Sequence, residues 1–137
     1  MITLLGTAYP IIQAPMAGIS TPALAAAVSN AGALGSLGVG ASSVDQARST
    51  ITQTQSLTDK PINVNVFCNA PPRRNRNIEA AWIGHFSAFF DKFCAKPPES
   101  LSEIYQTFVV AEDAFRMLLE VRPAFVSFHL AFHQLKR

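Results

Sequence analysis

The sequence predicts an α/β fold in which parallel strands alternate with helices. Short apolar runs that suit buried strands take turns along the chain with segments that carry helix caps and helical periodicity. A chain of 137 residues suits one domain or part of one. Its 49% hydrophobic and 15% charged residues exclude disorder as the general description. The first charged residue is Asp45, so we expect the segment from Met1 to Val44 to be buried.

A strand and a helix are expected first. The apolar run from Pro10 to Met16 predicts the strand, and Pro15 marks its end because proline cannot donate a hydrogen bond to a ladder. Thr21 can cap the helix that follows, and Pro22 suits its first position, where an amide hydrogen would have no partner. The Ala-rich stretch Ala23–Ala31 predicts a helix with a small face that can pack close to a sheet.

A second strand and a second helix come next. The strand is the very short apolar run Leu34–Leu37 between glycines. Ser43 and Gln46 have the spacing of a capping box, in which each side chain binds a backbone amide of the other residue. The box predicts a helix that continues to about Gln53.

The middle of the chain predicts a third strand and a long amphipathic helix. Apolar and polar residues alternate from Ile62 to Phe67, so that Asn63 and Asn65 point to one face. Large apolar residues then recur at helical spacing from Ile78 to Phe93. The sequence Lys96-Pro97-Pro98 ends this pattern.

The last part of the chain predicts a further helix and a fourth strand. Ser100 and Glu103 have the spacing of a second capping box, and the segment Ala114–Val121 is helical in pattern. The run Ala124–Phe128 predicts a strand that ends at His129. Four strands joined through helices imply right-handed crossovers and a parallel sheet.

The carboxyl ends of the expected strands predict the site, because in parallel α/β folds the loops there open into one crevice. Small residues, a thioether and asparagine amides stand at these ends. Such groups suit a flat, polarisable ring whose polar edge is hydrogen-bonded by an amide. The segments concerned are 14–18, 38–40, 65–69 and 127–129.

Three blocks of sequence carry a resemblance to a known family. They are PIIQAPMAGISTPALAAAVSNAGALGSLG, INVNVFC and PAFVSFH, which together span the chain from Tyr9 to His129. The chain resembles the amino-terminal part of the nitronate monooxygenases, also called 2-nitropropane dioxygenases, which are FMN-dependent TIM barrels. Within it, the segment Ala70–Ala111 is weak in family motifs and forms a long insertion between the third and fourth strands.

The resemblance implies four cofactor-binding positions. Backbone around Ala14 and Met16 would lie against the flavin, the Asn65 side chain would bind FMN, and His129 would lie at the flavin edge. Each position also has a simpler interpretation. Met16 suits an ordinary core residue, Asn65 suits a cap at a strand end, and His129 suits a buried, hydrogen-bonded histidine at a barrel rim.

The resemblance also implies that residues 1–137 form one partial domain, the amino-terminal half of an FMN-binding (β/α)₈ TIM barrel. A whole barrel takes about 250 residues, and this chain supplies about four strands with their helices. The tail 130–137 departs from the family pattern. The family's catalytic base would follow Arg137, so the catalytic residues are unknown and we expect the chain alone to be inactive.

Full-length members of the family oxidise alkyl nitronates with FMN and oxygen. The leading hypothesis is therefore a truncated nitronate monooxygenase-like flavoprotein, an oxidoreductase whose substrate is a small nitronate. One alternative is a fragment of a flavoprotein similar to enoyl-acyl-carrier-protein reductases. The other is a non-catalytic fragment that self-associates through the open edges of its sheet.

Other kinds of site are weakly supported. The cluster Arg73, Arg74 and Arg76 has no interleaved aromatic residues and suits a solvated loop, so we expect no nucleic acid. His129 and His133 have no carboxylate between them, so we expect no metal. Prolines interrupt every apolar run before it could span a membrane. Two cysteines and no leader-like start predict a cytoplasmic protein.

Overall fold

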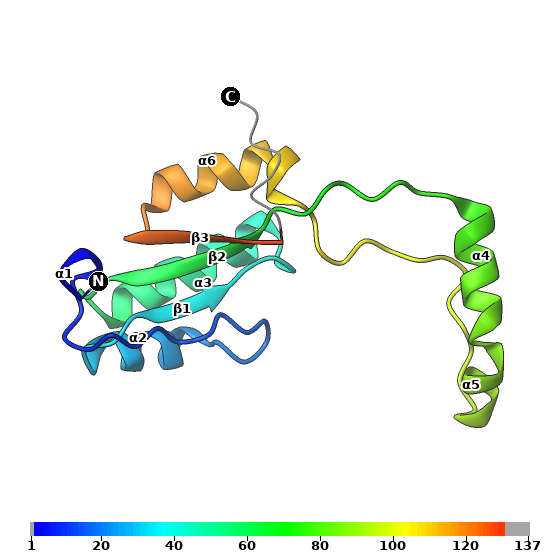
Figure 1. Ribbon diagram of the computed structural model, residues 1–137, viewed down its shortest axis with the longest axis horizontal. Helices are drawn as coiled ribbons and strands as arrows, with labels where there is room; N and C mark the ends of the chain where they lie inside the picture. The colour runs from blue at the N-terminus through cyan, green and yellow to red at the C-terminus, as the bar shows by residue number, and fades with distance from the viewer. Residues whose placement is uncertain (1, 131–137) are drawn as a thin grey trace. The chain divides into compact units, whose positions relative to one another are not determined.

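The computed structural model describes residues 2–130, which divide into two compact units. The first unit comprises residues 2–70 and 105–130, and the second comprises residues 71–104. Figure 1 shows the elements in chain order, which are α1 (Ile2–Leu5), α2 (Pro22–Asn30), β1 (Gly35–Gly38), α3 (Val44–Leu57), β2 (Ile62–Phe67), α4 (Arg76–His85), α5 (Ser87–Lys92), the 3₁₀ helix η1 (Phe108–Val110), α6 (Glu112–Val121) and β3 (Phe125–His129).

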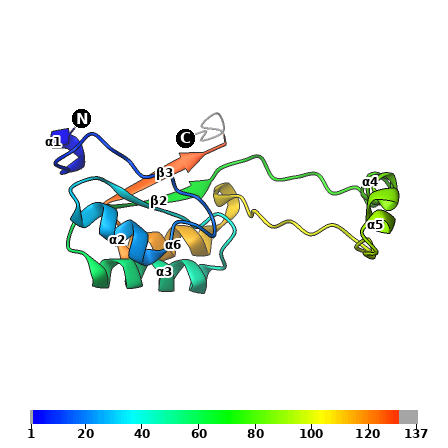
Figure 2. The same ribbon diagram turned by 90° about the horizontal axis from the view of Figure 1, so that it is seen from below.

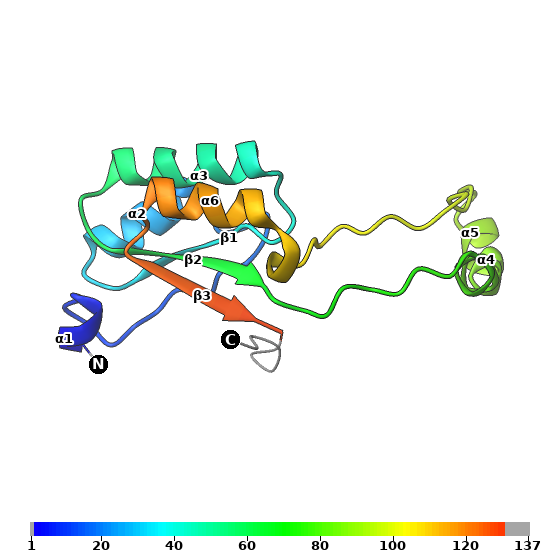
Figure 3. The same cartoon turned by 90° about the horizontal axis from the view of Figure 1, so that it is seen from above.

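The first unit is built on a three-stranded parallel sheet in the order β1-β2-β3. Its register places Leu37 opposite Val64 and Asn65 opposite Ser127. Figures 2 and 3 show that α2, α3 and α6 all cover the same face of this sheet. The sequence-based prediction of a parallel α/β sheet is confirmed.

The core lies between the sheet and these three helices. Because side chains alternate along a strand, the apolar residues of β2 face the helices and its asparagines face the opposite side. The predicted orientation of Asn63 and Asn65 is thereby confirmed, since both bind Ser127. The buried apolar cluster is Ala25, Leu37, Val39, Ala47, Ile51, Ile62, Val64, Val66, Cys68, Met117 and Leu118.

Local sequence signals set the starts of α2 and α3, as predicted. The Thr21 hydroxyl accepts a hydrogen bond from the amide of Leu24 at 3.2 Å. Ser43 and Gln46 form the complete capping box, with bonds of 3.2 and 3.0 Å. Helix α3 continues to Leu57, beyond the expected end, and contributes two of the buried core side chains.

The expected strand over residues 10–16 is wrong in extent, because only a single bridge at Ile12 pairs this segment with the residue before β1. Pro15 has no amide hydrogen with which to continue the ladder. The carbonyl of Ala14 instead accepts a hydrogen bond from Ser20 Oγ at 3.0 Å. The sheet of the described residues therefore has three strands and one bridge instead of four strands.

Burial of the uncharged amino-terminal segment is confirmed for part of α2 and for β1, but not for residues 9–19. That stretch forms one bridge to the segment before β1, and the side chain of Gln13 bonds the backbone of Ser36 in β1. Five of its large apolar side chains are exposed by 50% to 60%, namely Tyr9, Ile11, Ile12, Met16 and Ile19.

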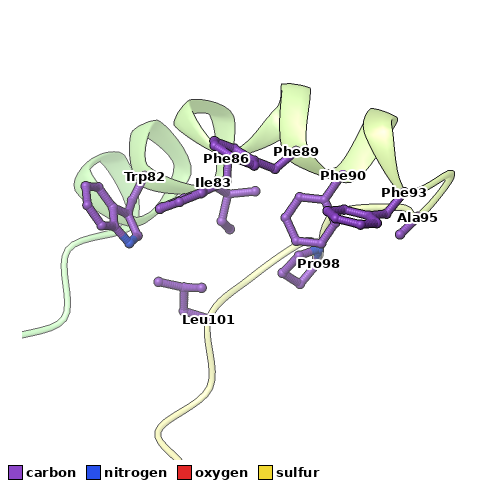
Figure 4. Close-up of a pocket in the computed structure, with 9 residues that line it drawn as sticks. All are labelled: Trp82, Ile83, Phe86, Phe89, Phe90, Phe93, Ala95, Pro98 and Leu101. Carbon is purple, nitrogen blue, oxygen red and sulfur yellow. The ribbon is translucent and has the colours of Figure 1, made fainter.

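The second unit contains two short helices where the sequence predicts one. α4 ends at His85 and α5 begins at Ser87, with Phe86 between them. Gly84 precedes the break, and glycine costs a helix about 1 kcal/mol relative to alanine. The apolar faces of the two helices and the returning chain form a groove of about 470 Å³, seen in Figure 4 and lined by Trp82, Ile83, Phe86, Phe89, Phe90, Phe93, Ala95, Pro98 and Leu101.

The predicted capping box of Ser100 and Glu103 is wrong, since no helix follows it. The carbonyl of Leu101 accepts a hydrogen bond from Arg74 Nη2 at 2.8 Å, so it does not serve a helical turn. The next α-helix begins only at Glu112, close to the predicted segment. The fourth predicted strand corresponds to β3, and residues 131–137 of the divergent tail lie outside the described residues.

Candidate functional site

A crevice of about 630 Å³ opens at the carboxyl ends of β2 and β3. This is where the sequence predicts the site, because loops that follow parallel strands open on the same edge of a sheet. The residues that line it are Pro15, Asn65, Phe67, Asn69, Tyr105, His129 and Leu130. Two of the four predicted positions, Asn65 and His129, thus line one crevice.

Asn65 is the most tightly held polar side chain of the crevice. It is 7% exposed, and its amide nitrogen Nδ2 donates to the Oγ of Ser127 at 2.9 Å and to the Ser127 carbonyl at 3.2 Å. Ser127 lies opposite Asn65 in the strand register. The amide is therefore fixed by the neighbouring strand, as a preorganised ligand contact requires.

Polar side chains continue from Asn65 into the uncovered face of the sheet. Asn63 Nδ2 donates to the hydroxyls of Ser127 and Ser36 at 3.0 and 3.2 Å. Gln13 in turn bonds both the amide and the carbonyl of Ser36, at 3.3 and 3.2 Å. These hydrogen bonds cross the sheet from Gln13 to Ser127, and Ser127 in turn bonds Asn65.

Aromatic rings form one wall of the crevice. The ring of Phe67 lies 5.3 Å from that of Tyr105 and 5.9 Å from that of His129, with both pairs tilted. Gly40 makes this possible, because a Cβ there would lie 2.6 Å from the Phe67 ring. The rings give the crevice a flat, polarisable surface beside the Asn65 amide.

Asn69 contributes a polar atom that has no partner. Its carbonyl is held by the Thr107 hydroxyl at 2.6 Å, and its side-chain nitrogen donates to the Ala70 carbonyl at 3.2 Å. Its side-chain oxygen Oδ1 is buried and accepts no hydrogen bond from any described residue. A buried acceptor of this kind is costly unless a water or ligand satisfies it.

The other two predicted positions, Ala14 and Met16, do not line the crevice. Pro15 between them does, and Met16 is 51% exposed. The backbone around them lies close to the end of β1, since a Cβ on Gly38 would meet the Pro15 carbonyl oxygen at 2.9 Å. The loop after Ile12 therefore lies beside the strand ends, and of residues 14–16 only Pro15 lines the crevice.

No metal-binding cluster is present in the part of the chain that the structure describes, residues 2–130. His133, the expected neighbour of His129, lies outside these residues. Cys68 is buried at the end of β2, and this burial raises the pKa of its thiol. The thiol therefore stays protonated at neutral pH and is a poor nucleophile.

Sequence reasoning missed Tyr105 as a site residue. Phe67 ends β2 and lies in the predicted strand-end segment 65–69, although no role is predicted for its ring. Tyr105 lies in the segment that is weak in family motifs, and no local pattern marks it. Its place in the crevice comes from tertiary contact with Phe67 alone.

A flavin ring fits the groups that line this crevice. The aromatic wall offers a surface for stacking, while Asn65 and the unsatisfied Asn69 Oδ1 offer hydrogen bonds to a polar ring edge. The fold and the crevice together are those of a parallel α/β protein with a candidate ligand site at its strand ends.

Comparison with known proteins gives the family. The family model for nitronate monooxygenase matches residues 1–136. A nitronate monooxygenase of Paraburkholderia phytofirmans is 53% identical over 129 residues, covering 94% of this chain and 35% of that protein. One from Pseudomonas aeruginosa is 51% identical over 126 residues, covering 92% and 36%. The chain belongs to the nitronate monooxygenase family, and spans about a third of the length of these relatives.

Solved structures agree with this assignment. The nitroalkane oxidase of Streptomyces ansochromogenes has a TM-score of 0.77 and 28% identity, with 94% of this chain and 36% of that one covered. FabK of Thermotoga maritima has a TM-score of 0.59 and 29% identity, with 92% and 28% covered. The prediction of the amino-terminal part of an α/β barrel is confirmed. None of the helices between residues 2 and 130 combines the length and hydropathy of a membrane span.

Proposed function

We propose that this chain supplies the amino-terminal part of the FMN site of a nitronate-oxidising flavoprotein. The observation that carries the proposal is Asn65, an amide fixed by two hydrogen bonds beside an aromatic wall at the strand ends. Membership of the nitronate monooxygenase family supports the reaction class. When bound, FMN supplies the redox chemistry, taking electrons from the nitronate and passing them to oxygen.

The residues of this chain bind and orient the ring. Asn65 hydrogen-bonds the polar edge of the ring, and its own hydrogen bonds to Ser127 keep that contact in place. Phe67 and Tyr105 offer an apolar surface that excludes water from one side of the crevice. His129 lies at the end of this aromatic wall, at the edge of the ring site.

The test joins residues 1–130 to the remaining chain of the Pseudomonas aeruginosa relative, which supplies the rest of a family barrel. Oxygen uptake is followed after addition of the nitronate form of nitropropane, and bound flavin is followed by its visible absorbance. We expect bound FMN and uptake that depends on the nitronate. A soluble hybrid without flavin would contradict the proposal. The matched control is Ser29→Ala, which removes two hydrogen bonds of a buried α2 side chain outside the crevice.

An enoyl-thioester reductase is the second candidate, and the likeness to FabK favours it. The two candidates differ in what reduces the flavin. The same hybrid is therefore assayed with a nicotinamide cofactor and an enoyl thioester, in the absence of nitronate. Reduction of the thioester, without oxygen uptake on nitronate, would favour this second candidate.

We also propose that the 137-residue chain self-associates and that it is cytoplasmic. β3 forms one edge of the sheet within the described residues, and on the neighbouring α6 Phe115 and Leu119 are 50% and 58% exposed. Apolar side chains beside a sheet edge favour association. The two cysteines are free, one buried and one exposed, which suits a reducing compartment.

A further inference from the structure

Ser127 sits where its hydroxyl and carbonyl groups together can decide which end of the Asn65 amide faces the crevice. β2 and β3 are parallel neighbours, and their register sets Ser127 opposite Asn65. Their side chains are hydrogen-bonded to each other on the sheet face opposite the apolar core, and Asn65 also lines the crevice. An asparagine at this point could offer a ligand either its N–H donors or its carbonyl oxygen.

The orientation of the Asn65 amide follows from the chemistry of its neighbours. The atom of Asn65 that lies 3.2 Å from the Ser127 carbonyl must be the nitrogen, because a carbonyl oxygen only accepts hydrogen bonds. The same nitrogen lies 2.9 Å from the Ser127 hydroxyl oxygen. Both N–H hydrogens of the amide therefore have acceptors on Ser127.

The Ser127 hydroxyl is itself held from the interior of the sheet. Its oxygen also accepts a hydrogen bond from Asn63 Nδ2 at 3.0 Å, and Asn63 is anchored to Ser36 at 3.2 Å. Two donors thus occupy the two lone pairs of this hydroxyl oxygen. The hydroxyl keeps its position, and the Asn65 amide keeps its orientation with it.

The remaining polar atom of Asn65 is its carbonyl oxygen Oδ1. No residue between 2 and 130 donates a hydrogen bond to it. We propose that Ser127 is a positioning residue which makes Asn65 a hydrogen-bond acceptor, so that the crevice selects a planar ring carrying an N–H donor at the facing edge. The inference rests on the proposed flavin function, because oxidised flavin has one ring N–H, at N3 between two carbonyl groups.

The test compares riboflavin with N3-methylriboflavin, which lacks that N–H. Both lack a phosphate, so contacts to the ring dominate their binding. Dissociation constants for the hybrid that carries residues 1–130 are measured from the quenching of flavin fluorescence. We expect the wild type to bind riboflavin about 10-fold more tightly, the change that corresponds to about 1.4 kcal/mol.

Variants of Ser127 separate positioning from general stability. Ser127→Ala should lower the ratio of the two dissociation constants, because only the main-chain carbonyl of residue 127 would then hold the amide, and Ser127→Thr, which keeps the hydroxyl, should restore it. If Ser127→Ala unfolds by circular dichroism, Ser127→Cys replaces it, because a thiol of similar size is only a weak hydrogen-bonding group. Ser29→Ala is the matched control, since Ser29 is a buried serine of α2 whose hydrogen bonds go to Pro61 and Gly35 and not to Asn63, Asn65 or Ser127.

Each outcome has one meaning. A ratio that Ser127→Ala leaves unchanged, or that Ser127→Thr fails to restore, overturns the positioning role while flavin binding stands. Equal binding of the two flavins by the wild type overturns the acceptor role of Asn65 and leaves the proposed flavin site intact. Failure of a folded wild type to bind either flavin overturns the proposed function, and this inference with it.

Discussion

Truncation of Asn65 tests the candidate site most directly. In the hybrid that carries residues 1–130, Asn65→Ala removes the amide that faces the crevice. It also removes the two hydrogen bonds to Ser127, at 2.9 and 3.2 Å. A ligand group that pairs with this amide would be left without a partner in a nearly dry site, since Asn65 is 7% exposed.

The size of the effect follows from that burial. Leaving a buried hydrogen-bonding group unpaired costs about 1 to 3 kcal/mol. Because each 1.4 kcal/mol is tenfold in affinity, the dissociation constant for FMN should rise by about 5-fold to 150-fold. The lost bonds to Ser127 act on folding instead, at about 1 kcal/mol each.

The assay is titration of the flavin-free hybrid with FMN, followed by flavin fluorescence, with urea unfolding measured in parallel. Ser29→Ala is the control, because it also removes two hydrogen bonds but lies in α2, outside the crevice and outside the contacts that hold Asn65. It should lower the free energy of unfolding and leave FMN affinity within about twofold, a change of about 0.4 kcal/mol. Equal FMN affinity for the wild type and Asn65→Ala would refute the assignment of Asn65 to the flavin site.

Three further predictions concern the 137-residue chain. Hydrogen bonds and charge from Arg74 lower the pKa of Glu79 below 4.5, so their pair stabilises α4 above about pH 4.5 and stops doing so as the pH falls through the lowered pKa. The difference in thermal midpoint between the wild type and Glu79→Gln should therefore shrink from pH 7 to pH 3 by circular dichroism; a constant difference would contradict this. Ile51→Ala, at a fully buried position of α3, should lower the free energy of unfolding in urea by about 2 to 5 kcal/mol. Leu57→Ala, at an exposed position of the same helix, should lower it by less than about 0.5 kcal/mol, and similar losses for the two variants would argue against the described core. Sedimentation should show oligomers that Leu119→Glu shifts toward monomer, and a monomeric wild type with a cooperative melt would rule out the proposed self-association.

The parts of the fold that the sequence predicts well are those governed by neighbours along the chain. The capping box of Ser43 and Gln46 and the alternation of Asn63 and Asn65 need only local geometry, and both are present. The strand-end rule also brings Asn65 and His129 to one crevice, because all strands of a parallel sheet end on the same side.

The parts that the sequence does not predict depend on distant contacts. The second capping box fails because Arg74 holds the Leu101 carbonyl across the hairpin of the second unit. The segment around Ile12 forms only a single bridge. The carbonyl of Ala14 accepts a hydrogen bond from the hydroxyl of Ser20 instead of pairing with the sheet, and the sequence does not reveal this competing contact. Tyr105 enters the crevice through its ring contact with Phe67, which no spacing along the chain reveals.

The turn between α6 and β3 has a consequence for which insertions and deletions this protein can tolerate. α6 ends at Val121, the capping residue Arg122 is left-handed with φ of 47°, and β3 begins at Phe125. Adding or removing one residue there would shift β3 by one position and turn each of its side chains to the other face. An apolar residue would then stand opposite Asn65 in place of Ser127. Substitutions in this turn are compatible with the site as long as its length is kept, although the turn itself does not line the crevice.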